Sequence, residues 1–313
     1  DDSNDDTNDD SNDDTNDDFD DDSNKSYIEE GSEYNSDFEN TSSTGSDQSD
    51  DEPELNIIIK NYSMIKDQIQ NIYKSQNIHY SMNEIDLLSP IPVPVRDIIC
   101  VGKNYAEHAK EVQKSSFSTL QGKVQVPEEP IIFNKATTSV IGPNDKIELV
   151  NDRTNTTDYE GELGVIIGKR TKNIKYSNAT DVIFGYTIIN DVTARKLQNN
   201  HKQWFIGKSP DTYCPIGPCI VTKDEIKIIE DIKIQTFING EIRQTGIIKD
   251  MIFNIPTIIE TLAKSMTLVE GDIIATGTPS GVGIGFDPPK FLKSGDKVKI
   301  SIDPIGILEN DVI

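Results

Sequence analysis

Apolar residues in the main part of this chain recur in short runs, many of them alternating with polar residues, and such runs predict β-strands. The dipeptide Asn239-Gly240 separates two of the runs and predicts a tight hairpin turn. The strands expected from this pattern lie at 97–102, 131–133, 146–149, 162–167, 182–189, 218–221, 232–238, 271–276 and 297–302.

Helical spacing of apolar residues is confined to three segments. It predicts helices at 57–74, 104–112 and 255–266, whereas three prolines make 87–95 extended. Strands and helices do not alternate regularly, so a dinucleotide-binding parallel fold is not expected. The sequence therefore predicts a β-dominated α+β fold with few helices.

Acidic residues are concentrated at the N-terminus of the 313-residue chain. Residues 1–55 hold 17 Asp, 6 Glu and one Lys, whereas the remainder holds 31 acidic and 29 basic residues. A segment this charged and poor in apolar residues is expected to be a disordered, low-complexity tail. We expect a short N-terminal region at 56–95 and the main domain at 96–313. That nearly neutral domain does not favour nucleic acid as a partner.

The chain shows no sign of a membrane segment or a disulfide framework. No apolar run approaches the roughly 18 residues that span a bilayer. Three cysteines in no close pairing indicate reduced thiols in an intracellular compartment. Cytoplasm and mitochondria are both expected compartments, because the sequence does not begin with Met and a targeting segment could have been lost.

Three acidic residues follow or begin the apolar runs near the middle of the chain. Glu160 and Glu162 stand two positions apart, so a strand would point both to one face, and Asp191 ends the next run. Oxygen ligands without Cys or His nearby favour Mg²⁺, Mn²⁺ or Ca²⁺. The alternative is a solvated strand end whose acids face water.

Four other residues are candidates for chemistry. His108 and Glu111 share a helical face, as in a general base oriented by a carboxylate, although a surface ion pair has the same spacing. Arg195 follows the strand that ends at Asp191 and could bind a substrate carboxylate. Lys208 lies in an apolar and aromatic stretch, where it either serves a site or extends to solvent.

A glycine-rich run at 276–285 follows the strand expected at 271–276. It lacks the Lys of a phosphate-binding P-loop and has no helix behind it, which excludes that motif. A loop for a small carboxylate substrate remains a hypothesis, because glycine-rich turns let the backbone approach an anion.

Together these segments resemble the fumarylacetoacetate hydrolase superfamily, and most closely its second-type domain-containing branch. The similarity runs from about residue 87 to the C-terminus. It is carried by 100–105, 130–133, 158–163, 204–218, 271–283 and 288–296.

The resemblance implies a mixed β-sandwich roll, a homodimer, one divalent cation per site and a lid at about 102–128. By position, Glu160, Glu162 and Asp191 match the metal ligands, and His108 and Glu111 match the dyad of the lid. The residues that match positions holding the oxo and carboxylate groups of a small 2-oxo acid are Arg195, Gln198, Lys208 and Thr278.

The resemblance also implies a reaction class. We expect metal-dependent hydrolysis of a carbon–carbon bond in 2,4-dioxo acids such as acylpyruvates. Oxaloacetate keto–enol tautomerisation or decarboxylation on the same site is the alternative, and a binding protein without activity is less favoured. Two departures bear on substrate choice and the lid: Lys196 replaces the usual acid, and an insertion extends to Val126.

Overall fold

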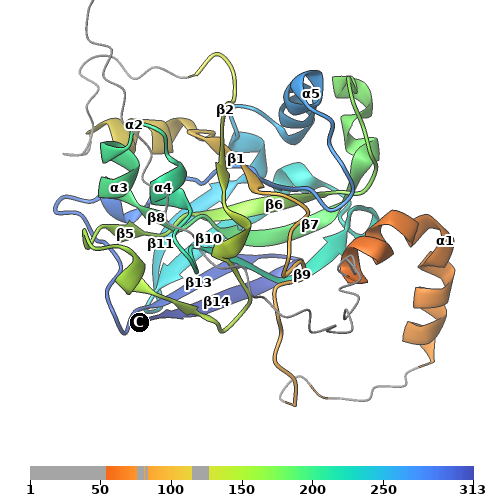
Figure 1. Cartoon of the computed structure of the whole chain (residues 1–313), viewed down its shortest axis with the longest axis horizontal. Coiled ribbons are helices and arrows are strands. Elements are labelled where there is room, and N and C mark those ends of the chain that lie inside the picture. The colour runs from red at the N-terminus through yellow and green to blue at the C-terminus, as the bar shows by residue number, and fades with distance from the viewer. Residues whose placement is uncertain (1–53, 76–80, 82–83, 115–126) are drawn as a thin grey trace, which may run out of the picture. The chain divides into compact units, whose positions relative to one another are not determined.

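The computed structural model describes residues 54–75, 81, 84–114 and 127–313. Most of the expected acidic tail and most of the expected insertion up to Val126 therefore lie outside the described residues. Among those that are described, two larger sheets and one strand pair form the framework, and helices surround it (Figure 1). The fold is strand-rich α+β with curled sheets, as the sequence predicts.

The larger sheet has seven strands in the order β2-β1-β12-β6-β7-β9-β3, with parallel pairs at β1–β12 and β3–β9. The second has five, in the order β11-β10-β13-β14-β4, and β5 pairs with β8. The strands of the first sheet are β1 (Ile98–Gly102), β2 (Ile131–Lys135), β3 (Val140–Ile141), β6 (Gly161–Ile167), β7 (Ile183–Asn190), β9 (Cys214–Thr222) and β12 (Ile273–Ala275). The others are β4 (Lys146–Ile147), β5 (Thr157–Asp158), β8 (Thr193–Ala194), β10 (Lys233–Ile238), β11 (Glu241–Ile247), β13 (Lys297–Ile302) and β14 (Gly306–Val312).

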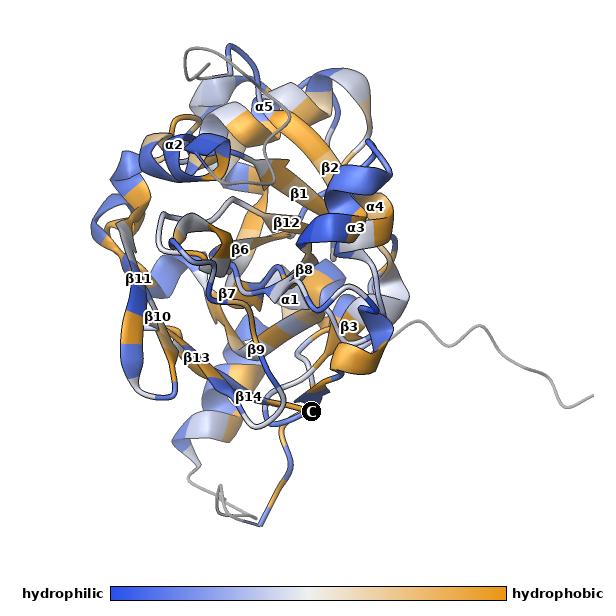
Figure 2. Cartoon of the chain, turned by 90° about the vertical axis from the view of Figure 1, so that its left-hand side faces the viewer, coloured by the Kyte–Doolittle hydropathy of each residue, from blue (hydrophilic) through white to orange (hydrophobic). Residues whose placement is uncertain are grey.

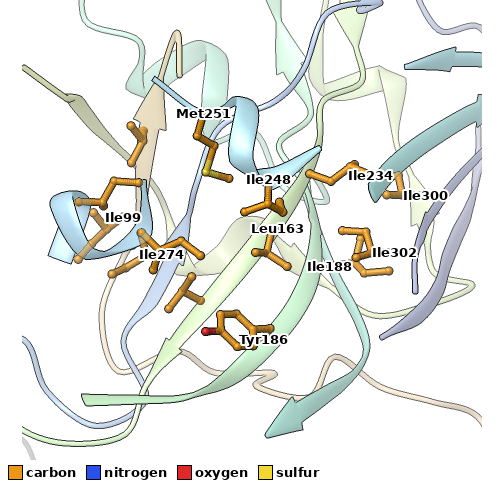
Figure 3. Close-up of a cluster of buried hydrophobic side chains, with 14 of the residues drawn as sticks. Ile99, Leu163, Tyr186, Ile188, Ile234, Ile248, Met251, Ile274, Ile300 and Ile302 are labelled. Atoms are coloured by element: carbon orange, nitrogen blue, oxygen red, sulfur yellow. The ribbon is translucent and has the colours of Figure 1, made fainter. Parts of the chain in front are cut away.

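The central strands of the seven-stranded sheet are buried on both faces, which explains their nearly continuous apolar sequence. Every residue of β6 is buried. Successive residues of one strand alternate between two apolar clusters, as Ile188 and Ile189 do on β7. The larger cluster joins the two sheets through Leu163, Ile188, Ile234 and Ile300 (Figure 3).

The structure contains five α-helices in its described part, three of which the apolar spacing predicts. Helix α5 begins after Asn254, whose side chain accepts a hydrogen bond from the Thr257 backbone at 3.0 Å, and it has proline in its first turn. Helix α1 contributes Ile59 to the smaller cluster. The helices are α1 (Glu54–Lys74), α2 (Ala106–Lys114), α3 (Arg195–Asn200), α4 (Phe205–Lys208) and α5 (Ile255–Ser265).

Most of the predicted local structure is confirmed. Asn239 and Gly240 have φ angles of 52° and 82°, as the hairpin between β10 and β11 requires. The strand expected at 146–149 is shorter, because a 3₁₀ turn follows it at Leu149. All three cysteines are free thiols. In the described ranges, no helix has the length and apolar character needed to cross a membrane.

Candidate metal centre and substrate pocket

Three buried carboxylates meet where β6 begins and β7 ends. The antiparallel register pairs Gly161 with Asn190, so Glu160 and Glu162 flank the end of β7, where Asp191 follows. One oxygen from each carboxylate lies within 4.8 Å of the others. The two glutamates are 4% and 1% exposed and the aspartate is fully buried, which rules out the solvated strand end.

Three cations contact this cluster, and two of them come from the short helices α3 and α4. Lys208 Nζ lies 2.9 Å from Glu160 Oε2 and 2.5 Å from Asp191 Oδ2. Arg195 Nη1 lies 2.6 Å from Glu160 Oε1. Lys135, at the end of β2, places Nζ 2.8 Å from Asp191 Oδ1 and 3.0 Å from the carbonyl oxygen of Val192. Lys208 is only 2% exposed, so it does not extend to solvent.

The carboxylates differ in how their charge is compensated. Burial alone would raise the pKa of Glu160, but Lys208 and Arg195 outweigh burial and hold that pKa well below its usual range. Burial and the neighbouring Asp191 and Glu160 raise the pKa of Glu162 well above its usual range. Glu162 accepts a hydrogen bond from the Gly277 backbone at 2.7 Å but makes no ion pair with any described residue.

This donor set fits a hard divalent cation. Two carboxylates carry lysine and arginine partners, whereas the buried carboxylate of Glu162 has no cation and lies beside both of them. Buried like charges are costly unless a further cation neutralises them. An all-oxygen set of this kind favours Mg²⁺, Mn²⁺ or Ca²⁺. Glu160, Glu162 and Asp191 are the residues that would hold the ion.

A pocket of about 400 Å³, including its open mouth, lies against the carboxylates. In the view of Figure 2, α2 lies on one side and α3 and α4 on the other, with the ends of β1, β12 and β6 between them. Seven of the nine residues expected at the site line this pocket; Asp191 and Glu111 lie directly behind it. The complete lining is Val101, Gly102, Lys103, His108, Val112, Phe133, Glu160, Glu162, Arg195, Gln198, Trp204, Lys208 and Thr278.

His108 and Glu111 form the expected dyad on α2. The Nδ1 atom of His108 lies 2.9 Å from Glu111 Oε1, and the imidazole is buried. Glu111 also accepts from the Gly281 backbone, at 2.9 Å to Oε2. The carboxylate therefore fixes the ring and joins α2 to the glycine-rich loop, which leaves Nε2 as the ring nitrogen without a partner in the dyad. This is not a surface ion pair.

Arg195, which lines the pocket, has one donor atom without a partner among the described residues. Its Nε donates to Asp158 Oδ2 at 2.8 Å and its Nη1 contacts Glu160, but Nη2 is buried without a hydrogen-bond partner among the described residues. A buried unsatisfied donor is costly, and a ligand carboxylate would satisfy it. The neighbouring Lys196, which the resemblance marks as a departure, is exposed and does not line the pocket.

The glycine-rich loop binds carboxylates of the protein itself. Backbone N–H groups of Gly277 and Gly281 donate to Glu162 and Glu111, and those of Gly283 and Ile284 donate to Asp158. These groups are therefore not free for a substrate carboxylate. The loop instead fixes the acids and, through Asp158, the guanidinium of Arg195.

The two remaining expected residues differ in what they can offer. Gln198 lines the pocket from α3, and the close approach of α4 at Gly207 fixes its backbone: an added Cβ would lie 2.4 Å from Gln198 N. Thr278 donates its hydroxyl proton to the carbonyl oxygen of Gly161 at 3.0 Å and accepts from Gln244 Nε2 at 2.7 Å. In this arrangement the hydroxyl oxygen of Thr278 can accept a hydrogen bond from a ligand but cannot donate one.

The sequence interpretation missed several residues of the site. Lys135 contacts the carboxylate of Asp191, and Asp158 contacts the guanidinium of Arg195. Trp204 packs against Phe133 in the pocket lining, with ring centroids 5.2 Å apart. Gly102 makes room for the indole, because a Cβ there would lie 2.4 Å from it. The position of Lys135 at the end of the apolar segment 131–135 could have marked it as a site residue. The contact between Phe133 and Trp204 joins segments far apart in the sequence, so no local pattern predicted it.

Comparisons with known proteins place the chain among sequences and structures of similar type. Residues 97–313 match the family model described as fumarylacetoacetate (FAA) hydrolase C-terminal. Oxaloacetate tautomerase YisK of Bacillus subtilis is 53% identical over 233 residues, 74% of this chain and 75% of the relative. The structure titled fumarylacetoacetate hydrolase from Exiguobacterium antarcticum is 46% identical, with TM-score 0.65 and coverage of 74% and 79% of the two chains. Maleylpyruvate hydrolase from Sphingobium sp. SYK-6 is 28% identical, with TM-score 0.68 and coverage of 83% and 85%.

Proposed function

The chain belongs to the fumarylacetoacetate hydrolase family, and on that premise we propose that it is a divalent-metal-dependent oxaloacetate keto–enol tautomerase. The observation that carries the proposal is the cluster of three buried carboxylates beside a pocket that also presents Arg195 and Lys208. Such a site suits a small 2-oxo acid, because it offers both a cation site and fixed positive charge for the substrate's oxygens.

The cation supplies a Lewis acid for the 2-oxo group when it is bound. Arg195 Nη2 is the donor available for the adjacent carboxylate. Lys208 contacts two carboxylates, so it remains charged and serves as a fixed positive group beside the oxygen that gains charge during enolisation.

His108 is our candidate for the proton transfer. Glu111 holds Nδ1, so Nε2 is the atom that would take the proton from C3 of the keto form. The oxygen at C2 gains a proton in the same interconversion, so the net change is one proton moved from carbon to oxygen. The reverse path converts the enol to the ketone.

Hydrolysis of acylpyruvates is the second candidate, which the similar structures titled fumarylacetoacetate hydrolase and maleylpyruvate hydrolase favour. His108 would then take a proton from water as its oxygen adds to the C4 carbonyl. The C3–C4 bond breaks, and C3 receives a proton to give pyruvate and a carboxylic acid. The homodimer expected from the resemblance stays a prediction.

An assay of the full chain separates these candidates. The rate at which enol-oxaloacetate disappears should rise above the buffer rate with Mg²⁺ or Mn²⁺ and return to it in EDTA. Cleavage of acetylpyruvate, measured as pyruvate formed, tests the hydrolase. Metal-dependent cleavage together with no effect on oxaloacetate would replace the tautomerase proposal with the hydrolase. Failure on both substrates would contradict both activities.

A further inference from the structure

Lys103 enters the pocket from an element that carries none of the metal ligands. It occupies the turn between β1 and α2, is half-buried, and lines the pocket together with His108 and Val112. The turn is fixed from its other side, because Asn104 Nδ2 donates to the carbonyl oxygens of Phe253 at 2.9 Å and Thr276 at 2.8 Å. The backbone that carries Lys103 is therefore fixed beside the pocket, on the side of α2.

Lys103 differs from the other cations of the site in having no acidic partner among the residues that the structure describes. Arg195 and Lys208 contact carboxylates, whereas Lys103 makes no hydrogen bond or ion pair with any residue that the structure describes. Burial lowers the pKa of Lys103, and no carboxylate offsets that effect. A half-buried ammonium without an anion is a position that a ligand anion can satisfy.

The backbone at this position also disfavours a side chain. Lys103 has a φ angle of 55°, a left-handed conformation that is strained for a residue other than glycine. Glycine would occupy this turn without that cost. A packing or structural role would offset the strain through contacts within the protein, yet the ammonium of Lys103 has none with a described polar group.

We propose that Lys103 binds the second carboxylate of a four-carbon dicarboxylate, at the end remote from the 2-oxo group. The inference rests on the proposed function, since it assumes that the carboxylate cluster, Arg195 and Lys208 receive the 2-oxo acid end. Lys103 then distinguishes oxaloacetate from 2-oxo acids that carry an uncharged group at the same end.

The test compares ligands with and without that distal carboxylate. Oxaloacetate carries it; oxalate, which resembles only the 2-oxo acid end and is expected to compete for that end of the pocket, does not. In Lys103→Met the KM for oxaloacetate should rise about 10- to 100-fold, the contribution of a charge-assisted hydrogen bond, while the oxalate inhibition constant should change less than about twofold. Lys103→Arg should restore KM. Lys110→Met is the matched control, because Lys110 lies on α2 but is exposed and paired with Glu107.

Equal weakening of oxaloacetate and oxalate, or an unchanged KM for oxaloacetate, would overturn the assignment while leaving the tautomerase intact. If the wild-type protein does not act on oxaloacetate, the proposed function fails, and calorimetry with L-malate and oxalate on the Mg²⁺-loaded protein decides the role of Lys103. Selective loss of malate binding in Lys103→Met supports the subsite. Absence of malate binding by the wild type, or equal binding by both proteins, contradicts it.

Discussion

The two sides of the pocket differ in how deeply their residues are buried and in how their charged groups are paired. The carboxylate wall consists of Glu160, Glu162, Asp191, Lys135, Arg195 and Lys208. The α2 wall consists of Lys103, His108, Glu111 and Val112. Every member of the first is buried, and each of its three cations contacts at least one acid. In the second, only His108 is buried, and Lys103 has no partner among the described residues.

The difference indicates a division of labour. The carboxylate wall is fixed by β6, β7 and the glycine-rich loop, so its charges are in place before a ligand arrives. The α2 wall joins that loop through Glu111 and Gly281 and joins Phe253 through Asn104. We infer that the first wall binds the cation and the 2-oxo acid end, and the second moves the proton and selects the distal group.

The largest effect is expected from Glu162→Ala. Loss of a metal ligand removes several kcal/mol of transition-state stabilisation, so metal-dependent turnover should fall by about 10³-fold or more. The metal-free fold should persist, because the substitution also relieves repulsion by Glu160 and Asp191. Turnover and melting temperature measured together check both statements.

The control for that variant is Glu107→Ala, which removes an exposed acid on α2 outside the pocket lining. It should leave turnover unchanged. Full activity of Glu162→Ala, or of the wild type after EDTA treatment, would show that the cluster is structural.

His108→Ala should reduce tautomerisation or acylpyruvate cleavage by about 10²- to 10⁴-fold, the usual contribution of general acid–base catalysis. Decarboxylation of oxaloacetate should lose less, because it requires chiefly an electron sink. Metal affinity should not change, since His108 lies on the α2 wall. If every activity survives, the proton transfer belongs to another group, and Lys208→Ala on the same substrates is the next comparison.

Lys135→Met tests how far the carboxylate wall depends on its buried cation. Removing one partner of a buried ion pair should lower the free energy of unfolding by about 3 kcal/mol in urea without metal. Metal affinity should fall about 10- to 100-fold, because Lys135 orients Asp191.

The matched control is Lys146→Met, which breaks the exposed pair with Asp311 at 2.6 Å. Surface pairs contribute about 1 kcal/mol or less, so its unfolding should remain close to that of the wild type. An equal loss of unfolding free energy in the two variants would mean that the buried ion pair of Lys135 contributes no more than an exposed one.

The acidic residues of the carboxylate wall could be predicted because their positions follow from patterns within short stretches of sequence. The spacing of Glu160 and Glu162 before an apolar strand, and the position of Asp191 at the end of the next, express the β6–β7 pairing directly. The long helices and the hairpin were predictable for the same reason, because each has a periodic or turn signal within its own segment.

Other features depend on contacts between distant segments. Helices α3 and α4 have six and four residues, which is too short to show a repeating pattern of apolar positions. They form where they pack on each other near the pocket. Trp204 reaches the pocket only because Gly102, far away in sequence, leaves space for its ring. That Lys103 has no ionic partner among the described residues is likewise visible only in the folded pocket.

Equilibrium binding of Mn²⁺ tests the central claim most directly, because it needs no substrate. The wild-type chain should bind one ion at the cluster, and Glu162→Gln, which preserves shape but removes the unpaired charge, should weaken that binding by about 100-fold or more. Glu107→Gln should bind as the wild type does. Equal Mn²⁺ affinity in the wild type and Glu162→Gln would contradict the metal centre.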